Sequence, residues 1–272
     1  MLIRIDDPND SRIELYRDVR ERDLVGRGER FIAEGEVVLR VLLTLSHMSV
    51  ESILLAEQRV SRINSLLDNL PAGTPVYVAS QAVMDGIVGF PIHRGILAVG
   101  RRREKPSMEA LLAGLPPQAL VVGLIGLANH DNVGGIFRNA AAFGVDALLL
   151  DPSTCDPLYR KAIRVSVGGS LIVPFVRAES SGAMLMALTA AGFDIIALSP
   201  AGSQRLADIK PTGRTALLLG AEGAGLPPEV LRGSRTARID MAGGFDSLNV
   251  ATTSGIALYQ LATSRTEALA AS

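Results

Sequence analysis

Two polar side chains, Ser247 and Asn249, stand just before a long apolar helical pattern in the stretch GGFDSLNVATTSGIALYQL, residues 243–261. A Ser or Asn side chain can accept hydrogen bonds from the free amides of a first helical turn. Capping explains one of the two residues. It leaves the other, and the two glycines before them, without a structural role. The stretch is therefore a candidate for a binding or catalytic loop.

A second polar loop, NHDNVGGIFRNAAAFG at residues 129–144, follows an apolar run and opens a helical pattern. Asn132 is predicted to cap this helix at its N-terminus, and Gly144 to end it. Arg138 falls on the side opposite the apolar face, among residues too small to cover it: Gly134, Ala141 and Ala142. Such an arginine is either an ordinary surface residue or the anion-binding group of a cleft. At this point the residues favour neither.

A glycine-rich loop lies in LLLGAEGAGLPPEVL, residues 217–231, and it contains Gly220, Gly223 and Gly225. The first interpretation is the phosphate-cradling loop of a Rossmann-type enzyme. The spacing G-x-x-G-x-G opposes it, because the glycines come in the wrong order. The carboxylate of Glu222 inside the loop would also repel a pyrophosphate. A cationic or neutral ligand suits this loop better, and S-adenosylmethionine, a sulfonium, is one such ligand.

The other reactive side chains indicate no metal centre. His47, His93 and His130 are scattered and lack metal-ligand spacing with the single cysteine, Cys155. Cys155 has no paired base nearby in sequence and is expected to be an unreactive loop thiol. His130 belongs to the loop at 129–144, but contact with substrate is the less favoured role for it.

The composition bounds the class of protein. Among 272 residues, 48% are hydrophobic, which supports a sizeable core, and the net charge of −1 excludes the global basic field of a generic nucleic-acid binder. One cysteine fits a reducing compartment. No apolar run approaches the roughly 20 residues that cross a bilayer, and the N-terminus lacks a signal pattern. We expect a cytoplasmic protein without a membrane segment.

The apolar pattern predicts the strands and helices that carry these loops. From residue 119 the chain has apolar runs with little alternation, and these are ALVVGLIGLA, VDALLLD, LIVPFV, FDIIALS, TALLLG and ARIDM. Such runs are typical of strands buried on both faces. Because helical patterns separate several of them, we predict an α/β domain over residues 119–272, with a mainly parallel sheet and helices on each side.

The first hundred residues predict a smaller α/β domain. Helical patterns occur at 31–45 and 59–70, and strand patterns at 50–56, 74–80 and 94–101. The charged, proline-containing stretch 101–118 predicts a linker that carries one short helix. The expected organisation is a domain at 1–100, a linker at 101–118 and a domain at 119–272.

Taken together, the segments NVGGIFR, LGAEGAGL and SLNV resemble the three motifs of SpoU-type RNA ribose 2′-O-methyltransferases of the SPOUT superfamily, the TrmH family. They occur in the family's order, each at a strand end, and the resemblance covers residues 119–261. The N-terminal part resembles the family's RNA substrate-binding, L30e-like domain through FIAEGEVVL and HRGILAV. The resemblance implies a deep trefoil knot in the C-terminal SPOUT domain.

The resemblance also implies an activity, S-adenosylmethionine-dependent 2′-O-ribose methylation of a structured RNA, either rRNA or tRNA. It implies a homodimer that pairs through the last helix. The residues themselves predict no metal site and no membrane segment. The positions that match the family's catalytic residues are Asn132, Arg138, Glu222, Ser247 and Asn249. The positions that match its cofactor-binding residues are Gly220, Ile239, Met241 and Leu248.

The sequence departs from the family pattern at three places. Ala221 replaces a common Asn, Asp240 replaces a common Pro at the floor of the expected cofactor pocket, and VATT replaces the usual VSVA after Asn249. None of these departures removes a matched functional residue. The alternative from another class is a catalytically silent RNA-binding or assembly protein with the same fold. Loss of Arg138 or Asn249 would have favoured it, and both are present.

Overall fold

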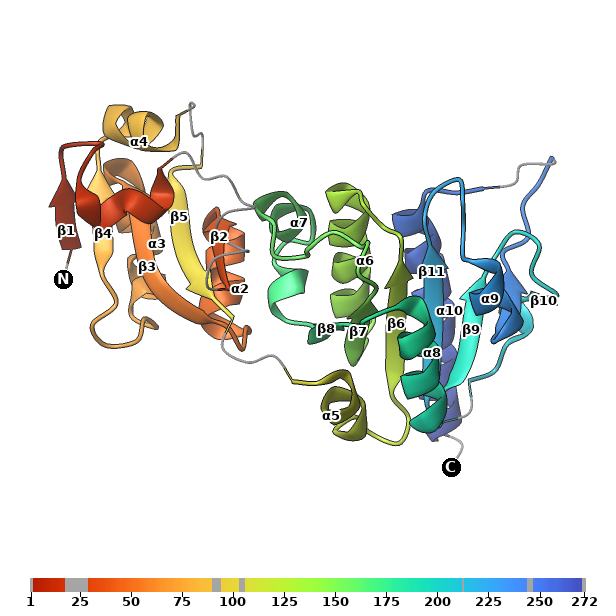
Figure 1. Cartoon of the computed structure of the whole chain (residues 1–272). Coiled ribbons are helices and arrows are strands. Elements are labelled where there is room, and N and C mark those ends of the chain that lie inside the picture. The colour runs from red at the N-terminus through yellow and green to blue at the C-terminus, as the bar shows by residue number, and fades with distance from the viewer. Residues whose placement is uncertain are drawn as a thin grey trace. The chain divides into compact units, whose positions relative to one another are not determined.

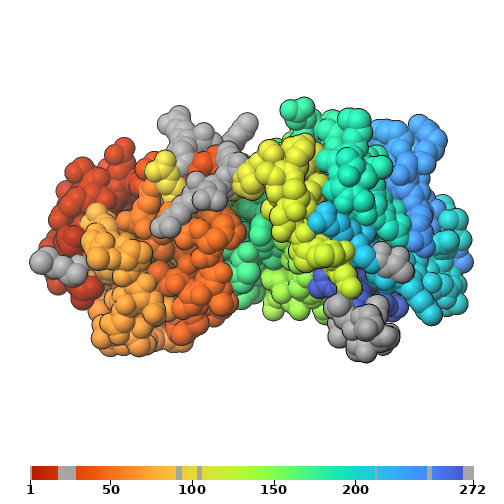
Figure 2. All heavy atoms as spheres, turned by 90° about the horizontal axis from the view of Figure 1, so that it is seen from below, coloured from red at the N-terminus to blue at the C-terminus, as the bar shows by residue number. Residues whose placement is uncertain are grey.

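A computed structural model describes residues 2–17, 29–89, 94–102, 106–211, 213–243 and 247–270, with side chains as far as residue 265. His93 lies outside these ranges. The chain forms two compact units. The N-terminal unit comprises Met1–Glu104 together with Asp156–Ile172, and the C-terminal unit comprises Lys105–Cys155 together with Val173–Ser272. Figures 1 and 2 follow the chain through both units in colour.

The N-terminal unit is built on a five-stranded mixed sheet in the order β1-β4-β3-β5-β2. Its strands are β1 (Leu2–Ile5), β2 (Arg30–Glu34), β3 (Ser49–Ala56), β4 (Val76–Ala79) and β5 (Ile96–Arg101). Strand β5 runs antiparallel to both β3 and β2, whereas β1, β4 and β3 are parallel. The helical elements are α2 (Glu36–Thr44), α3 (Val60–Leu67), α4 (Gln81–Val88) and two short 3-10 helices, η1 (Ser11–Tyr16) and η2 (Glu57–Arg59).

The helix predicted over residues 31–45 is wrong in its first part. Residues Arg30–Glu34 form strand β2, and the helix begins only at Glu36. Gly35 separates the two elements with a φ of 93°, a conformation that side-chain-bearing residues rarely adopt. The apolar run before Gly35 pairs with β5, and the ring of Phe31 lies directly over Gly100. A short apolar run fits a buried strand as well as a helix, so periodicity could not separate them.

One segment between two strands of the C-terminal unit packs in the N-terminal unit. It contains helix α7 (Arg160–Val165) and the 3-10 helix η3 (Gly169–Leu171), and it contacts β2. Arg160 lies 3.7 Å from the buried carboxylate of Glu34, and the Ser46 hydroxyl donates to the carbonyl of Leu171 at 2.7 Å. The expected strand at 171–176 is shorter than predicted, because Leu171 ends η3 and strand β8 begins at Phe175.

The C-terminal unit contains a seven-stranded sheet in the order β10-β12-β9-β11-β6-β7-β8, and every pairing in it is parallel. This confirms the predicted parallel α/β architecture. The strands are β6 (Leu120–Ile125), β7 (Ala147–Leu150), β8 (Phe175–Arg177), β9 (Asp194–Leu198), β10 (Gln204–Arg205), β11 (Thr215–Gly220) and β12 (Arg235–Arg238). The helical elements are α5 (Met108–Ala113), α6 (His130–Ala142), α8 (Ser181–Ala190), the 3-10 helix η4 (Leu206–Asp208), α9 (Pro228–Arg232) and α10 (Val250–Ala270).

Helices cover both faces of this sheet, as predicted. Successive residues of a strand point to opposite faces of the sheet. On one face, Val121 of β6 and Leu218 of β11 pack with α5, α8 and α9 in one core cluster. Helices α6 and α10 pack together against the other face, and Figure 1 shows α10 behind β11. The helix expected within the stretch 101–118 is α5, and its Leu112 is buried in the same cluster.

A turn after β7 fixes the loop that leads into α6. The Asp151 carboxylate accepts hydrogen bonds from the backbone amides of Gly126 (3.1 Å) and Thr154 (2.8 Å), and from the hydroxyls of Ser153 and Thr154. Burial alone would raise the pKa of Asp151. The hydrogen bonds from Ser153 and Thr154, with that from Gly126, outweigh burial and lower the pKa below its ordinary value.

This lowered pKa makes the stability of the protein depend on pH. The contribution of the Asp151 carboxylate is complete above the ordinary aspartate range and is lost as pH falls through the lowered pKa. We predict that Asp151→Asn lowers the free energy of unfolding by about 1–3 kcal/mol at neutral pH, because an amide nitrogen cannot accept the Ser153 bond. Urea unfolding between pH ~2 and ~7 should show a shallower acid dependence for this variant. Asp68→Asn, at an exposed position, serves as the control. If the free energy of unfolding depended on acid pH equally in Asp151→Asn and in the wild type, the prediction would be contradicted.

Candidate active site

A cavity of about 370 Å³ opens where strands β9, β11 and β12 reach their carboxyl ends. In open α/β sheets this is the edge at which ligands bind. The described residues that line it are Leu198, Ser199, Pro200, Leu219, Gly220, Ala221, Glu222, Gly223, Gly225, Ala237, Ile239, Met241, Ser247, Leu248, Val250 and Thr253. All four residues proposed to bind the cofactor are among them, as are Glu222 and Ser247.

Close backbone packing shapes the glycine-rich wall of this cavity. Gly220 ends β11 and lies against the backbone of Gly225, so that a Cβ at Gly220 would come within 2.4 Å of the Gly225 carbonyl carbon. Gly223 and Gly225 adopt φ values of 80° and 68°, which favour glycine. The amide of Gly225 donates to the Ala221 carbonyl at 2.9 Å and closes the loop. Glu222 is thereby held at the cavity wall.

Three polar residues, one from each of the three sequence motifs, form one hydrogen-bonded network: Asn132, Glu222 and Asn249. The amide nitrogen of Asn132 donates to Oε1 of Glu222 at 2.8 Å. The amide nitrogen of Asn249 donates to Oδ1 of Asn132 at 2.9 Å and to the same Glu222 oxygen at 3.2 Å. One carboxylate oxygen therefore receives two amide donors, which leaves the second oxygen, Oε2, outside this network.

Asn132 is not the N-cap of α6, contrary to the sequence prediction. Asn129 is the cap, and its side chain accepts from the amide of Asp131 at 2.8 Å. Asn132 lies one turn later, is only 4% exposed and does not line the cavity. Its side-chain oxygen and nitrogen are both used within the protein, so Asn132 orients Glu222 and Asn249. The predicted helix end is correct, because Gly144 follows the last turn with a φ of 66°.

The two polar residues before α10, Ser247 and Asn249, have different roles. The side-chain oxygen of Asn249 accepts from the amides of Ala251 (2.9 Å) and Thr252 (3.2 Å) and so caps the helix. The nitrogen of the same side chain belongs to the network with Glu222. Ser247 lines the cavity. Asn249 therefore serves the helix and the site at the same time.

Arg138 lies apart from the cavity. It is exposed on α6 and is not among the residues that line the cavity. A neighbouring face of α6 packs closely on α10, where Gly135 faces Ala251 and the amide nitrogen of Asn139 donates to the Ala251 carbonyl at 2.8 Å. The fold thus places the Arg138 side chain at the surface, outside the cavity.

Some lining residues were not anticipated from the sequence. Ser199 and Pro200 follow β9, and Val250 and Thr253 belong to the first turn of α10. The only signal for the first pair is their position after an apolar run, which marks a strand end without specifying which strand ends lie together. His130 does not line the cavity. No cluster of His, Cys, Asp or Glu suited to a metal occurs among the described residues.

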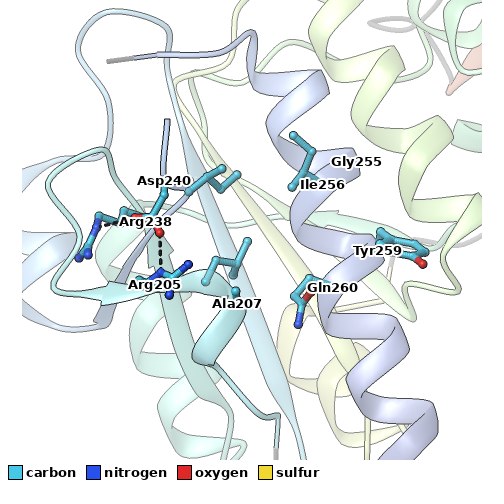
Figure 3. Close-up of a pocket in the computed structure, with 10 residues that line it drawn as sticks. Arg205, Ala207, Arg238, Asp240, Gly255, Ile256, Tyr259 and Gln260 are labelled. Atoms are coloured by element: carbon cyan, nitrogen blue, oxygen red, sulfur yellow. Dashed lines mark hydrogen bonds and ion pairs between the residues drawn. The ribbon is translucent and has the colours of Figure 1, made fainter. Parts of the chain in front are cut away.

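A second cavity, of about 520 Å³, lies on the other side of the segment that follows β12. Figure 3 shows Arg205, Arg238 and Asp240 on one wall and residues of α10 on the other. Ile239 lines both cavities. No helix among the described residues is both long and apolar enough to cross a membrane.

Comparison with known proteins decides the family. The profile of the SpoU rRNA Methylase family matches residues 119–259, which contain the glycine loop, the amide network and most of the cavity. The chain belongs to the SpoU family. A relative in this family, an uncharacterized tRNA/rRNA methyltransferase of Mycobacterium bovis, is 39% identical over 264 residues, covering 93% of this chain and 89% of the relative.

Other SpoU proteins agree with this assignment at greater distance. The 23S rRNA (guanosine-2′-O-)-methyltransferase RlmB of Escherichia coli K12 is 29% identical over 192 residues, covering 69% of this chain and 79% of RlmB. Among solved structures, an AdoMet-bound rRNA methyltransferase from Sinorhizobium meliloti superposes with a TM-score of 0.81 at 25% identity, covering 98% of both chains. The mixed α/β architecture is thus that of SpoU methyltransferase structures.

The double role of Asn249 leads to a testable prediction. Asn249→Ala removes the cap and should lower the free energy of unfolding by about 1 kcal/mol. Asn249→Ser keeps a capping oxygen and should recover at least half of that loss, although it lacks the amide donor to Glu222. Urea denaturation of the two variants beside the wild type measures the difference. Equal destabilisation by Ala and Ser would show that the cap contributes nothing.

Proposed function

We propose that this SpoU protein methylates the ribose 2′-oxygen of a structured RNA, rRNA or tRNA, with S-adenosylmethionine as methyl donor. The observation that carries the proposal is the network of Asn132, Glu222 and Asn249, because it joins all three sequence motifs at the wall of one cavity. The names of the relatives, tRNA/rRNA methyltransferase and 23S rRNA (guanosine-2′-O-)-methyltransferase, point to the same substrate class.

The cavity fits S-adenosylmethionine in its chemistry. Apolar side chains of Ile239, Met241 and Leu248 offer surface for a purine, and the close-packed glycine loop exposes backbone groups for hydrogen bonds. The carboxylate of Glu222 favours a ligand that carries positive charge and opposes a pyrophosphate. S-adenosylmethionine, when bound, supplies an electrophilic methyl group on a sulfonium.

The residues around the cavity have separate tasks in the proposed reaction. Methyl transfer requires an in-line approach of the ribose hydroxyl, so most of the catalysis is positioning. Ser247 at the cavity wall and Asn249 orient the ribose, and Glu222 is held by its two amide donors. Arg138 binds an RNA phosphate and stabilises the developing oxyanion, because a guanidinium stays protonated and is a poor base.

The proposal includes the topology of the chain and the tasks of its two domains. The cavity combines chain from three separated regions, the turns after β9 and β11 and the segment from Ile239 to Val250. This convergence supports a trefoil knot in which the last segment passes through a loop. We further assign RNA affinity to the N-terminal domain, residues 1–100, as an L30e-like module, and the chemistry to residues 119–272. Both belong to a cytoplasmic enzyme.

Two alternatives remain as outcomes of experiment. A catalytically silent RNA-binding or assembly protein would keep the fold and lose methyl transfer. A Rossmann-type nucleotide enzyme would bind NAD or ATP, which Glu222 in the glycine loop disfavours.

The proposal predicts that the purified protein binds S-adenosylmethionine and binds neither NAD nor ATP, and that it transfers the methyl group to RNA. Calorimetry measures binding, and mass spectrometry of nuclease-digested RNA identifies 2′-O-methylated nucleosides. Tight NAD binding without an S-adenosylmethionine signal would refute the proposal. Cofactor binding without transfer to rRNA or tRNA would favour the silent RNA-binding protein.

Arg138→Ala provides the sharpest test of the catalytic assignment. Because Arg138 is exposed and outside the cavity, cofactor affinity and unfolding should match the wild type, whereas methylation should fall by about 100-fold or more. Arg232→Ala removes another exposed arginine, on the opposite side of the sheet, and serves as the matched control. Wild-type turnover of Arg138→Ala would return this arginine to an ordinary surface role.

We also propose that the protein is a homodimer that pairs through α10. Leu258 and Leu261 are buried within the unit, but Ile256 and Tyr259 on the same helix are 42% and 61% exposed. An exposed apolar pair on one helix face is suited to a second copy of the chain. Ile256→Asp combined with Tyr259→Glu should yield a monomer in light scattering at micromolar concentration. Met186→Asp, at a 69% exposed position on α8, should leave the dimer intact. A monomeric wild type would refute the pairing.

A further inference from the structure

The segment after β12 reaches the proposed cofactor cavity without support from the sheet. The last ladder pairs of β12 join Ala237 to Leu198 of β9 and Arg238 to Arg205 of β10. Ile239 and Met241 lie beyond these pairs and nevertheless line the cavity. Their positions therefore depend on contacts other than strand pairing.

Asp240, between these two residues, is held by two arginines. Its Oδ2 accepts a short hydrogen bond from Nε of Arg205, and its Oδ1 accepts from Nε of Arg238 at 3.1 Å. Figure 3 shows these ion pairs on the wall of the second cavity. The hydrogen bond with Arg205, followed by the nearby charges of Arg205 and Arg238, lowers the pKa of Asp240, so the carboxylate is ionised at neutral pH.

The same arginines connect this segment to the turn after β9. Arg238 Nη1 donates to the carbonyls of Gly202 (2.9 Å) and Ser203 (3.3 Å). Gly202 packs so closely on the backbone of Ala237 that a Cβ there would come within 2.3 Å of a carbonyl carbon. Arg205 follows in the same stretch of chain, as the last residue of β10. The turn after β9 and the segment after β12 form two walls of one cavity, and the charged cluster ties them together.

We propose that Asp240 is a positioning residue for the cofactor, which through Arg205 and Arg238 fixes the segment that carries Ile239 and Met241 into the cavity. The inference rests on the proposed function, since it concerns the affinity of the same cavity for S-adenosylmethionine. Asp240 lines the second cavity and not the first, so it acts through its neighbours. A proline at this position would restrict the backbone covalently through its ring. The ion pairs of Asp240 restrict the same backbone through its side chain.

The exposure of the cluster sets the size of the effect. The side chains of Arg205, Asp240 and Arg238 are 55%, 47% and 36% exposed. Ion pairs this exposed contribute little and are screened by salt. We therefore expect about a 3- to 10-fold change in cofactor affinity when the cluster is broken, and a dependence of that affinity on ionic strength.

The experiment compares full-length variants by calorimetry with S-adenosylmethionine at about 0.05 M and about 0.5 M NaCl. Asp240→Ala and Arg205→Ala should each weaken binding by about 3- to 10-fold, and the double variant should be no weaker than either one. Asp240→Pro should restore affinity to within about 2-fold of the wild type at low salt and should be insensitive to salt. In methylation assays, Asp240→Ala should raise the KM for the cofactor and leave kcat nearly unchanged.

Hydrogen–deuterium exchange without cofactor tests the tether independently of the proposed function. Amides at 239–241 and at 199–203 should exchange faster in Asp240→Ala and Arg205→Ala than in the wild type. Unchanged exchange and unchanged affinity in these variants would overturn the inference, as would an Asp240→Pro variant as weak as Asp240→Ala. A wild type that binds no S-adenosylmethionine would refute the proposed function, and faster exchange in the variants would then still establish the tether.

Discussion

The carboxylate of Glu222 accepts hydrogen bonds from two amide side chains, Asn132 and Asn249, and this arrangement joins the parts of the site. Each of the three residues follows a different strand or opens a different helix, so none can be displaced without disturbing the others. Asn249 adds a further link because its oxygen caps α10. The start of the last helix and the wall of the cavity are thus fixed by one side chain.

Close backbone approaches bring these groups within reach. Gly220 against Gly225 and Gly202 against Ala237 leave no room for a Cβ, and Gly135 allows α10 to pack on α6 at Ala251. Parallel strands set the carboxyl ends of β9, β11 and β12 at one edge of the sheet. Close packing of loops at that edge then creates a cavity walled by backbone and apolar side chains. The charged cluster around Asp240 extends this support to the segment after β12, which lies beyond the ladder.

Helices α6 and α10 pack against each other and also carry exposed side chains. Their facing sides carry small residues and the hydrogen bonds of Asn139 to the Ala251 carbonyl and the Ser254 hydroxyl, so the two helices form one layer. Arg138 on α6 and Ile256 on α10 are exposed, and Tyr259 is largely exposed although its ring also packs edge-on against Phe143 at the end of α6. An arginine and two apolar side chains therefore remain accessible on a layer whose other side is buried against the sheet.

The sequence alone indicated the parallel α/β architecture, because several apolar runs such as 120–125 and 215–220 alternate with helical patterns, as is typical of strands buried on both faces. It also singled out Glu222, a carboxylate within a glycine-rich loop, and the polar pair Ser247 and Asn249, of which capping explains only one. It could not determine that Phe31 lies in a strand, that Asn129 and not Asn132 caps α6, or that Ser199 and Ser247 line one cavity. Local patterns report a residue's preferences within one element. Which strand ends are neighbours, and which side chain reaches which partner, is decided by long-range packing that no single segment encodes.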